Sequence, residues 1–457
     1  MPFFTLEQLK KCTDCKVLSQ SANKFSAIST DTRTIKKGMV FLAIRGEKFD
    51  GHNFIKKAIE KGAAGIIISE REKAENFIQN SVTIMLVEDT LQSYINIAGS
   101  WRDQFKIPVI AITGSNGKTT TKDLAAALLS VKYNVLKTQK NFNSEIGMAL
   151  TLLSLEQQYQ AAVIEIGMRG LGQIRTLAKA AKPDIGVVLN IGQTHMELLG
   201  SQENIARAKG ELVEAIKPGG KVILNADDKY VDYMIKKSQG KVITFAIYSH
   251  ADIRAENIQM LGNNKTRFEC IMPNGRVEVT IPLIGIHNVY DALAAIAIGY
   301  EMHLNVEDIQ RGFDTFKPSG MRFEILQVNG YTLINDAYNA SPASMKAAID
   351  NLLVMTAKKR IVVFGDMKEL GSIEKSAHRE IGTICANKNI NVLITLGELA
   401  RYAGISARAE NMKNVYMCAA HEEIVSILND ILEEGDIVLI KGSHSMHMEK
   451  IINLLEK

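Results

Sequence analysis

The feature that most constrains the fold is a short polar loop between an apolar run and a helical pattern. The run from Ile107 to Thr113 (IPVIAIT) predicts a buried strand, and residues Thr120 to Val131 predict the helix that follows. Glycines in such a loop let backbone N–H groups turn toward phosphates, the helix N-terminus adds a favourable dipole, and Lys118 supplies a positive charge. The three parts together predict a phosphate-binding site in an α/β domain.

The loop contains the residues that we expect to bind a nucleotide. Ile112 stands where the common GxxxxGKT loop has its first glycine, so this is the shorter GxNGKT form. The side-chain hydroxyl after the lysine is a ligand for Mg²⁺ in loops of this kind. The expected ATP ligands are Gly114, Ser115, Asn116, Gly117, Lys118, Thr119 and Thr120, and Thr119 is also the expected metal ligand.

Alternating strand-like and helical patterns predict three α/β domains. A chain of 457 residues is too long for one ordinary core, and its length suggests about three domains. Apolar runs alternate with helical patterns after the first segment, which predicts parallel sheets covered on both faces. We expect a small N-terminal α/β domain in residues 1–83, a central parallel-sheet ATP-binding domain in 84–316 and a Rossmann-like C-terminal domain in 317–457.

Composition limits the partners of the chain. Lys and Arg number 54 against 50 Asp and Glu, and the basic residues are spread along the chain. This balance argues against nucleic acid or an anionic membrane as the main partner. No apolar run approaches the roughly 20 residues of a spanning helix, and the N-terminus lacks the apolar stretch of a secretory signal. Five scattered cysteines fit a reducing compartment. We therefore expect a cytoplasmic monomer.

Two polar residues follow strand-like runs at the edge where open α/β sheets bind ligands. Glu165 lies at the end of the run AAVIEI, and His195 follows IGVVLNIG. Position alone leaves their roles open, because such a glutamate can cap a helix and a lone histidine is usually a surface or packed residue. Lys209, inside the helical pattern Glu203 to Ile216, is by default a solvated surface lysine.

The loop variant and the order loop, glutamate, histidine resemble the Mur ligase family, which also includes the folate polyglutamate ligases. The resemblance implies that Glu165 and His195 bind Mg²⁺. It also implies that Lys209 is carbamylated and that its carbamate helps bridge the metal ions. A deprotonated amine near cations can add CO₂ and become a carboxylate analogue, so this role is chemically sensible. Lys118, His195 and Lys209 are then the expected catalytic residues.

Later motifs extend the resemblance into the rest of the chain. It implies that Asn288, in the helix start HNVYDALAA, lies near the adenine and that Arg322 reaches the nucleotide phosphates from the third domain. Asp336 would meet the ribose or phosphate side of ATP, while Tyr338 and Asn339 would approach the other substrates. The plain structural interpretation of NDAYNASP is a strand followed by a helix with a serine cap and an early proline, and both interpretations can hold.

Four stretches resemble the family members that add D-alanyl-D-alanine: Ser29 to Ile55, Asn141 to Leu153, Asn335 to Met345 and Phe364 to Gly371. They imply that ATP activates UDP-N-acetylmuramoyl-tripeptide as an acyl phosphate and that D-alanyl-D-alanine attacks it, with the uridine nucleotide held by the first domain. The residues expected to bind these substrates are Ser29, Thr30, Thr32, Arg33, Asn143, Ser144, Tyr338 and Asn339.

Two positions depart from the family pattern. Thr32 stands where serine is usual and retains the hydroxyl, so we expect this position still to bind the uridine nucleotide. His444 stands where many members carry arginine, which leaves any phosphate or carboxylate contact of that arginine open. Two other functions also stay open. One is a family ligase with another amino substrate, and the other is a P-loop NTPase that couples hydrolysis to motion or partner binding. The NTPase alternative leaves Lys209 and NDAYN without a role.

The division of the expected ATP ligands between two domains predicts a movement. The phosphate loop belongs to the middle domain, whereas Arg322 and Asp336 belong to the third. Both sets can meet one nucleotide only if the domains approach, and closure would exclude water from the acyl phosphate. Without ligands we expect an open form, in which Arg322 and Asp336 lie too far from Lys118 to share a phosphate.

Overall fold

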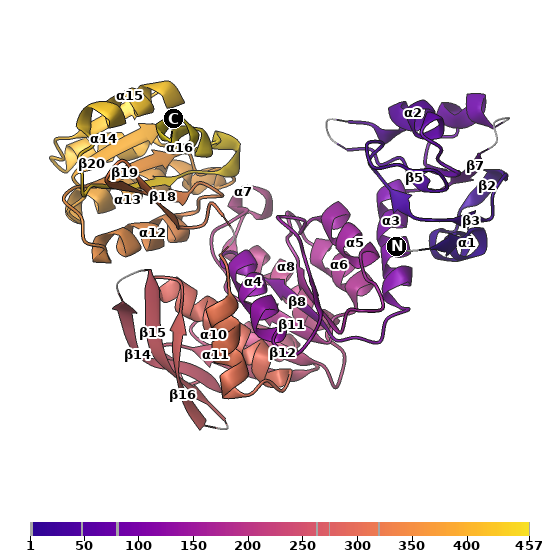
Figure 1. The fold of residues 1–457 in the computed structure, drawn as a ribbon, viewed down its shortest axis with the longest axis horizontal. Helices are drawn as coiled ribbons and strands as arrows, with labels where there is room; N and C mark the ends of the chain where they lie inside the picture. Colours follow the sequence, from indigo (N-terminus) through magenta and orange to yellow (C-terminus); the bar gives the residue numbers. More distant parts are fainter. Residues whose placement is uncertain are drawn as a thin grey trace.

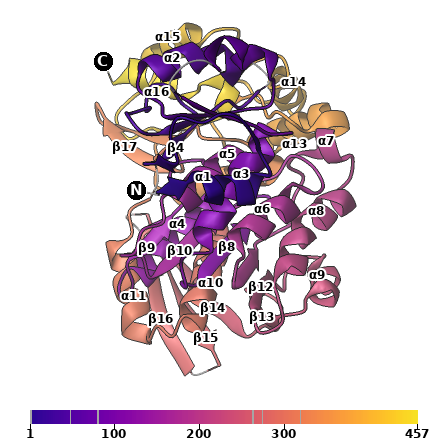
Figure 2. The same ribbon diagram turned by 90° about the vertical axis from the view of Figure 1, so that its right-hand side faces the viewer.

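Three α/β domains follow one another along the chain. The computed structural model describes residues 3–46, 49–78, 82–261, 264–273, 275–318 and 320–456. Figure 1 places the N-terminal and C-terminal domains on opposite sides, both above the central domain, and the view in Figure 2 agrees. Each domain is organised around a mainly parallel sheet, so the predicted α/β class with three domains is confirmed.

The N-terminal sheet has five strands in the order β2-β7-β6-β5-β4 within the described residues. Its strands are β2 (Lys16–Ser19), β4 (Ile28–Ser29), β5 (Val40–Leu42), β6 (Gly65–Ile68) and β7 (Thr83–Leu86). Only β2 pairs antiparallel. A small pair, β1 (Phe4–Thr5) and β3 (Lys24–Phe25), lies beside helix α1 (Leu6–Thr13). The boundary expected at residue 83 falls on the first residue of β7, because this strand completes the first sheet.

Helix α3 (Thr90–Arg102) connects the first domain to the second. It packs against α1 of the first domain and against α5 (Glu145–Leu153) and α6 (Gln173–Ala181) of the central domain. A single hydrophobic core runs through this junction and includes Leu9 and Met85 from the first domain together with Ile164 and Leu212 from the second. The two domains therefore share buried apolar surface.

The central sheet has nine strands, in the order β16-β15-β14-β13-β12-β11-β8-β10-β9 among the described residues. The six strands from β8 to β13 are β8 (Val109–Thr113), β9 (Val135–Lys137), β10 (Ala161–Glu165), β11 (Ile185–Val188), β12 (Lys221–Asn225) and β13 (Lys241–Ala246). β14 (Ile253–Leu261) extends the parallel part, and β15 (Lys265–Met272) and β16 (Gly275–Ile281) add an antiparallel edge. The sequence patterns did not predict this edge.

Helices cover both faces of the central sheet, as parallel sheets require. One face carries α4 (Lys118–Leu129), α10 (Ile286–Glu301) and α11 (Val306–Thr315). The other carries α5, α6 and α8 (Gln202–Ala215). The strands between them are almost entirely buried, for example all five residues of β8. The phosphate loop therefore starts from a rigid strand end.

The C-terminal sheet has the order β17-β18-β22-β19-β20-β21 among the described residues. Its strands are β17 (Glu324–Val328), β18 (Tyr331–Asp336), β19 (Arg360–Gly365), β20 (Val392–Leu396), β21 (Val415–Cys418) and β22 (Ile437–Lys441). Only β17 is antiparallel. One face packs against α12 (Pro342–Val354), α13 (Glu374–Asn387) and α14 (Arg401–Ala409), and the other against α15 (His421–Ile431) and α16 (Glu449–Leu455). Ser341 caps α12 and Pro342 opens it, as the sequence predicts.

No helix in the part of the chain that the structure describes is long and apolar enough to cross a membrane.

Candidate active site

A cavity of about 1170 Å³ lies where the central and C-terminal domains meet. The central domain contributes the phosphate loop, the ends of β10, β11 and β12, and the start of α10. The C-terminal domain contributes the ends of β18 and β22 and the segment after β19. These are carboxyl ends of parallel strands, where open α/β sheets bind ligands. The cavity is the candidate active site.

The phosphate loop is held in a fixed shape from two sides. Gly117 has φ +83°, and a Cβ there would lie 2.1 Å from Oδ1 of Asp291, so only glycine fits. The backbone N–H of Asn116 donates to Oδ1 of Asn190 over 2.9 Å, and the N–H of Gly192 donates to Oγ of Ser115 over 2.8 Å. These neighbours thus hold the loop in its phosphate-binding shape.

Lys118 turns back onto its own loop. Its Nζ donates to the carbonyl oxygen of Gly114 over 2.9 Å. Burial lowers the pKa of this amine, the Glu165 carboxylate opposes that shift, and the Arg322 charge adds to it. A bound phosphate would compensate the unfavourable burial of this charge, because it brings the opposite charge to the same place.

Thr119 and Glu165 form a buried polar pair at the edge of the loop. Oγ1 of Thr119 donates to Oε2 of Glu165 over 2.8 Å, and Nδ2 of Asn143 donates to Oε1 over 2.7 Å. The Glu165 side chain is almost fully buried. Hydroxyl and carboxylate oxygens are the ligands that Mg²⁺ prefers. The donor set therefore fits the hard cation that an ATP-binding loop requires.

Lys209 is 2% exposed, so the default interpretation of a solvated surface lysine is wrong. It lies on α8, and it is not among the residues that line the cavity. Burial, and then the charge of Lys118, lower the pKa of its amine well below the ordinary value. A lowered pKa favours the neutral form of the amine, which is the form that reacts with CO₂.

His195 lies in the left-handed region, with φ +62°, immediately before helix α7 (Met196–Leu199). Its Nδ1 is 2.6 Å from Oε2 of Glu369 in the C-terminal domain. The Nδ1 atom lies close to this carboxylate but is not aligned for a hydrogen bond. Both residues line the cavity. Sequence reasoning missed Glu369, although it belongs to the FGDMKELG stretch that was singled out for specificity.

Residues of the third domain reach the phosphate loop directly. Nη2 of Arg322 donates to Oγ1 of Thr119 over 2.9 Å, and Oγ of Ser341 donates to Oδ1 of Asn116 over 2.9 Å. These bonds place Arg322 close enough to the loop to share a phosphate with Lys118, and the expected movement between an open and a closed form stays a prediction. Asp336 lines the same cavity but pairs with Lys441 of its own domain, over 2.7 Å.

The start of helix α10 forms the wall beside the loop. Asn288 lines the cavity and donates from Nδ2 to the carbonyl oxygen of Ile284 over 2.7 Å. Asp291, one turn later, is 5% exposed and accepts from Oγ1 of Thr121 over 3.2 Å. Burial raises the pKa of this carboxyl to about 8. Sequence reasoning missed Asp291, since nothing local marks a residue whose partner lies 170 positions away.

The expected substrate residues divide into two groups. Asn143, Ser144, Tyr338 and Asn339 line the cavity. The expected first-domain residues, Ser29, Thr30, Thr32 and Arg33, do not. The guanidinium of Arg33 pairs with Asp31 over 2.7 Å and is largely exposed, so it is free to turn toward a ligand on the first domain. The structure leaves this group on a separate domain (Figure 1).

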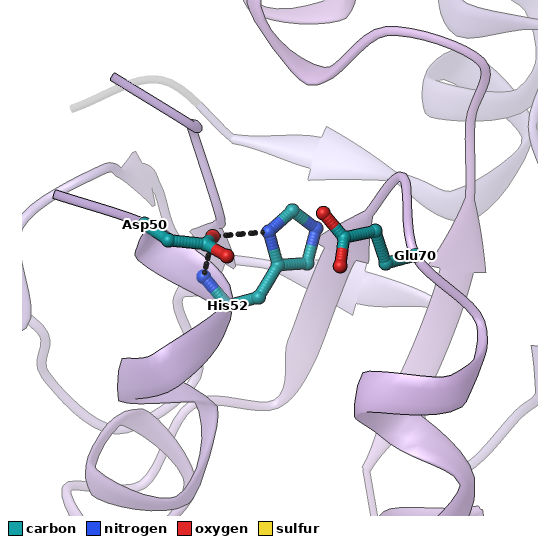
Figure 3. A group of neighbouring side chains, drawn as sticks. All are labelled: Asp50, His52 and Glu70. Carbon is teal, nitrogen blue, oxygen red and sulfur yellow. Dashed lines mark hydrogen bonds and ion pairs between the residues drawn. The ribbon is translucent and has the colours of Figure 1, made fainter. Parts of the chain in front are cut away.

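A second polar cluster lies in the N-terminal domain, where Asp50, His52 and Glu70 approach one another (Figure 3). Nδ1 of His52 is 2.7 Å from Oδ1 of Asp50, and Nε2 accepts from the backbone N–H of Ser69 over 3.1 Å. Glu70 pairs with Arg45 over 3.0 Å. Both ring nitrogens of His52 therefore have partners, and neither offers a lone pair to a metal. The side chain links Asp50 to the backbone at the end of β6.

Three protein-family models match the chain. "Mur ligase family, catalytic domain" covers residues 24–98, "Mur ligase middle domain" covers 112–299, and "Mur ligase, glutamate ligase domain" covers 321–444. Together they span the three domains and include the cavity.

Curated relatives match nearly the whole chain. The UDP-N-acetylmuramoyl-tripeptide–D-alanyl-D-alanine ligase of Bacillus subtilis is 36% identical over 430 residues, which are 93% of this chain and 92% of that protein. The ligase of the same name from Escherichia coli is 32% identical over 437 residues, 94% of each chain.

Solved structures resemble the whole fold. A crystal structure of MurF from Acinetobacter baumannii has a TM-score of 0.92 at 29% identity and covers 100% of both chains. The MurF ligase of Thermotoga maritima in complex with ADP has a TM-score of 0.82 at 26% identity, covering 94% of this chain and 97% of that one. A folylpolyglutamate synthase of Mycobacterium tuberculosis shares the fold, with a TM-score of 0.63 at 15% identity over 80% of this chain.

Proposed function

Because this chain belongs to the Mur ligase family, we propose that it is the ATP-dependent ligase that joins D-alanyl-D-alanine to UDP-N-acetylmuramoyl-tripeptide. The observation that carries this proposal is the junction of the phosphate loop with Arg322 and Tyr338 of the third domain in one cavity. That junction can hold an ATP γ-phosphate beside a second substrate. Relatives with this activity cover more than nine tenths of the chain, which supports the choice of substrates.

The nucleotide lies along the loop and the start of α10. The backbone N–H groups from Gly117 to Thr120, at the start of α4, face the phosphates, and Lys118 and Arg322 supply positive charge from two domains. Asn288 lies on the adenine side, and Asp336 with its Lys441 partner lies on the ribose or phosphate side. The ADP complex of a structural relative supports nucleotide use by this fold.

Mg²⁺ belongs to the proposal as well. Thr119, Glu165 and His195 would hold it, together with Lys209 as a carbamate. Their fit rests on the oxygen pair of Thr119 and Glu165 and on the buried amine of Lys209, whose pKa burial lowers. When bound, the metal neutralises charge on the transferring phosphoryl group.

The reaction proceeds in two steps. A carboxylate oxygen of the tripeptide forms a bond to the γ-phosphorus while the bond to the bridging oxygen of ADP breaks, which gives an acyl phosphate. The amine of D-alanyl-D-alanine then attacks the acyl carbon and loses a proton, and phosphate leaves. Lys118 and Arg322 hold the phosphoryl oxygens in place, and the two domains exclude water, so positioning and electrostatics supply the rate.

The N-terminal domain holds the uridine end of the long substrate. Ser29, Thr30, Thr32 and Arg33 would bind it there, while Asn143, Ser144, Tyr338 and Asn339 hold the peptide and the dipeptide in the cavity. A UDP-linked peptide is long enough to be shared between two domains, so the separation of these groups fits one extended substrate (Figure 1). The enzyme works as a monomer in the cytoplasm, where ATP is supplied.

Product analysis tests the proposal. The purified protein, ATP, the UDP-tripeptide and D-alanyl-D-alanine should yield one UDP-pentapeptide for each ADP, measured by mass spectrometry and chromatography. Omitting either organic substrate should stop ADP release. Equal ADP release without them would favour the NTPase alternative, and product formed only with another amino acid, such as glutamate, would favour a different ligase of the family.

A further inference from the structure

Glu369 and His195 come from different domains and meet inside the cavity. The Nδ1 of His195 lies 2.6 Å from Oε2 of Glu369. The Glu369 side chain is 39% exposed and that of His195 is 25% exposed, so the pair is partly shielded from water. A carboxylate beside one ring nitrogen fixes which nitrogen keeps the proton.

The other nitrogen of His195 remains available. No hydrogen bond to Nε2 of His195 occurs among the described residues, and the side chain lines the cavity. An imidazole that binds a metal through one nitrogen almost always presents its other N–H to a carboxylate or carbonyl, which sets the ring orientation and raises the basicity of the ligand. The Glu369 carboxylate stands on the side of the ring that such a partner takes.

The backbone around Glu369 is held against the central domain. The N–H of Glu197 donates to the carbonyl oxygen of Glu369 over 3.3 Å. Glu369 itself has φ +63°, and a Cβ on Gly371 would come within 2.9 Å of the Cα of Glu197. The N–H of Lys368 donates to Oγ of Ser443 over 2.9 Å, which anchors the same segment in its own domain. Contacts with both domains therefore fix the position of this segment and of the Glu369 carboxylate that it carries.

We propose that Glu369 is a positioning residue, supplied by the third domain, that orients His195 so that Nε2 can bind the divalent metal of the ATP site. The inference rests on the metal assignment of the proposed function and goes beyond it. Metal affinity then depends on the contact between the two domains, because the group that orients a ligand on one domain belongs to the other.

The test measures metal binding and needs no turnover. Mn²⁺ replaces Mg²⁺ as a probe, and its binding to the full-length protein with a non-hydrolysable ATP analogue is followed by enhanced water proton relaxation. Glu369→Ala should weaken Mn²⁺ binding about 10- to 100-fold, the range known for loss of such partners. The Mn²⁺ affinity of Glu369→Gln should lie between those of the wild type and Glu369→Ala, because the amide oxygen can still accept from Nδ1. Glu197→Gln is the matched control, because that exposed carboxylate lies on the same interface and should leave affinity unchanged.

A second measurement separates orientation from a general structural role. In ¹⁵N-histidine-labelled protein, the His195 signal should report a proton on Nδ1, and Glu369→Ala should shift it toward a mixture of tautomers. Mn²⁺ affinity of Glu369→Ala within two-fold of the wild type, or tighter, would overturn the inference. A wild-type protein that forms no ternary complex with Mn²⁺ would instead remove the metal from the proposed function, which is a distinguishable failure.

Discussion

The guanidinium of Arg322 lies 3.8 Å from the centre of the Tyr338 ring, and the same group donates to the hydroxyl of Thr119. The ring thus supports the cation that bridges the two domains. A cation–π contact of this kind contributes about 0.5–2 kcal/mol. Tyr338 also meets His444 edge to face, with ring centres 5.9 Å apart, so the aromatic contacts continue to the segment that follows β22.

Substitutions of Tyr338 should distinguish the contribution of the ring face from that of the phenolic hydroxyl. Tyr338→Phe should retain most of kcat/KM for ATP, because the face of the ring remains. Tyr338→Leu should lose roughly three- to thirty-fold, the equivalent of the stacking energy. Steady-state kinetics at saturating organic substrates would measure both. Equal losses in the two variants would assign the role to the hydroxyl instead.

Lys118→Ala should abolish ligation and leave the fold intact. Among the described residues its amine donates hydrogen bonds only to carbonyl oxygens of the loop, so its removal breaks no hydrogen bond to another element. Turnover and thermal melting of the variant measure the two parts of this expectation. Normal turnover at saturating ATP would exclude the phosphate role. Lys122 lies on the same helix but is not a suitable control, because its buried amine donates to the carbonyl oxygen of Thr138.

Lys209→Ala should be nearly inactive and should regain part of its activity when short-chain carboxylic acids are added. A small acid can occupy the place of the carbamate, because both present the same oxygen pair to a metal. Lys209→Arg is the informative control, since a guanidinium offers no neutral amine that could add CO₂. Full activity of either variant without added acid would remove Lys209 from the site.

Asp291 should give the protein a distinctive dependence of stability on pH. Its carboxyl releases a proton near pH 3.8 in the unfolded chain and near pH 8 in the folded protein, where burial raises the pKa. Between these values the folded state binds more protons than the unfolded state, so this group lowers the free energy of unfolding progressively up to about pH 8. The variant Asp291→Asn cannot ionise, and its gain over the wild type should grow from pH 5 to pH 8 to a few kcal/mol.

Urea unfolding at several pH values would measure this gain, with Asp308→Asn as a control of opposite sign. A hydrogen bond from Lys132 lowers the pKa of Asp308, so its stabilising effect is present at neutral pH and disappears as the pH falls through the lowered pKa. The control should therefore be less stable than the wild type at pH 7 and approach it in acid. A gain for Asp291→Asn that does not change with pH would mean that the carboxyl ionises normally in the folded protein.

The sequence predicts those features that depend on neighbours along the chain. Strand, loop and helix around Lys118 are contiguous, and so are Ser341 and Pro342 at the start of α12. Local pattern also marks Glu165, because it ends a run of apolar residues. The domain count followed from the recurrence of such patterns over a long chain.

Features that depend on distant pairs could not be predicted from such patterns. Glu369 meets His195 across a domain junction, and Asp291 meets Gly117 across a helix packing. The first sheet continues through β7 because Ile84 and Met85 pair with β6, a register that no local pattern reveals. The contact of Arg322 with Thr119 could not be predicted either, since the docking of two domains decides that distance.

The core shared by the first two domains has a consequence for how the protein melts. Leu9 and Met85 belong to the same apolar cluster as Ile164 and Leu212, with α3 buried between them. Heat or denaturant cannot expose one half of that cluster without opening the other, so we expect the first two domains to unfold together. Damage to the uridine-side domain is thereby transmitted to the ATP site as lost thermal stability.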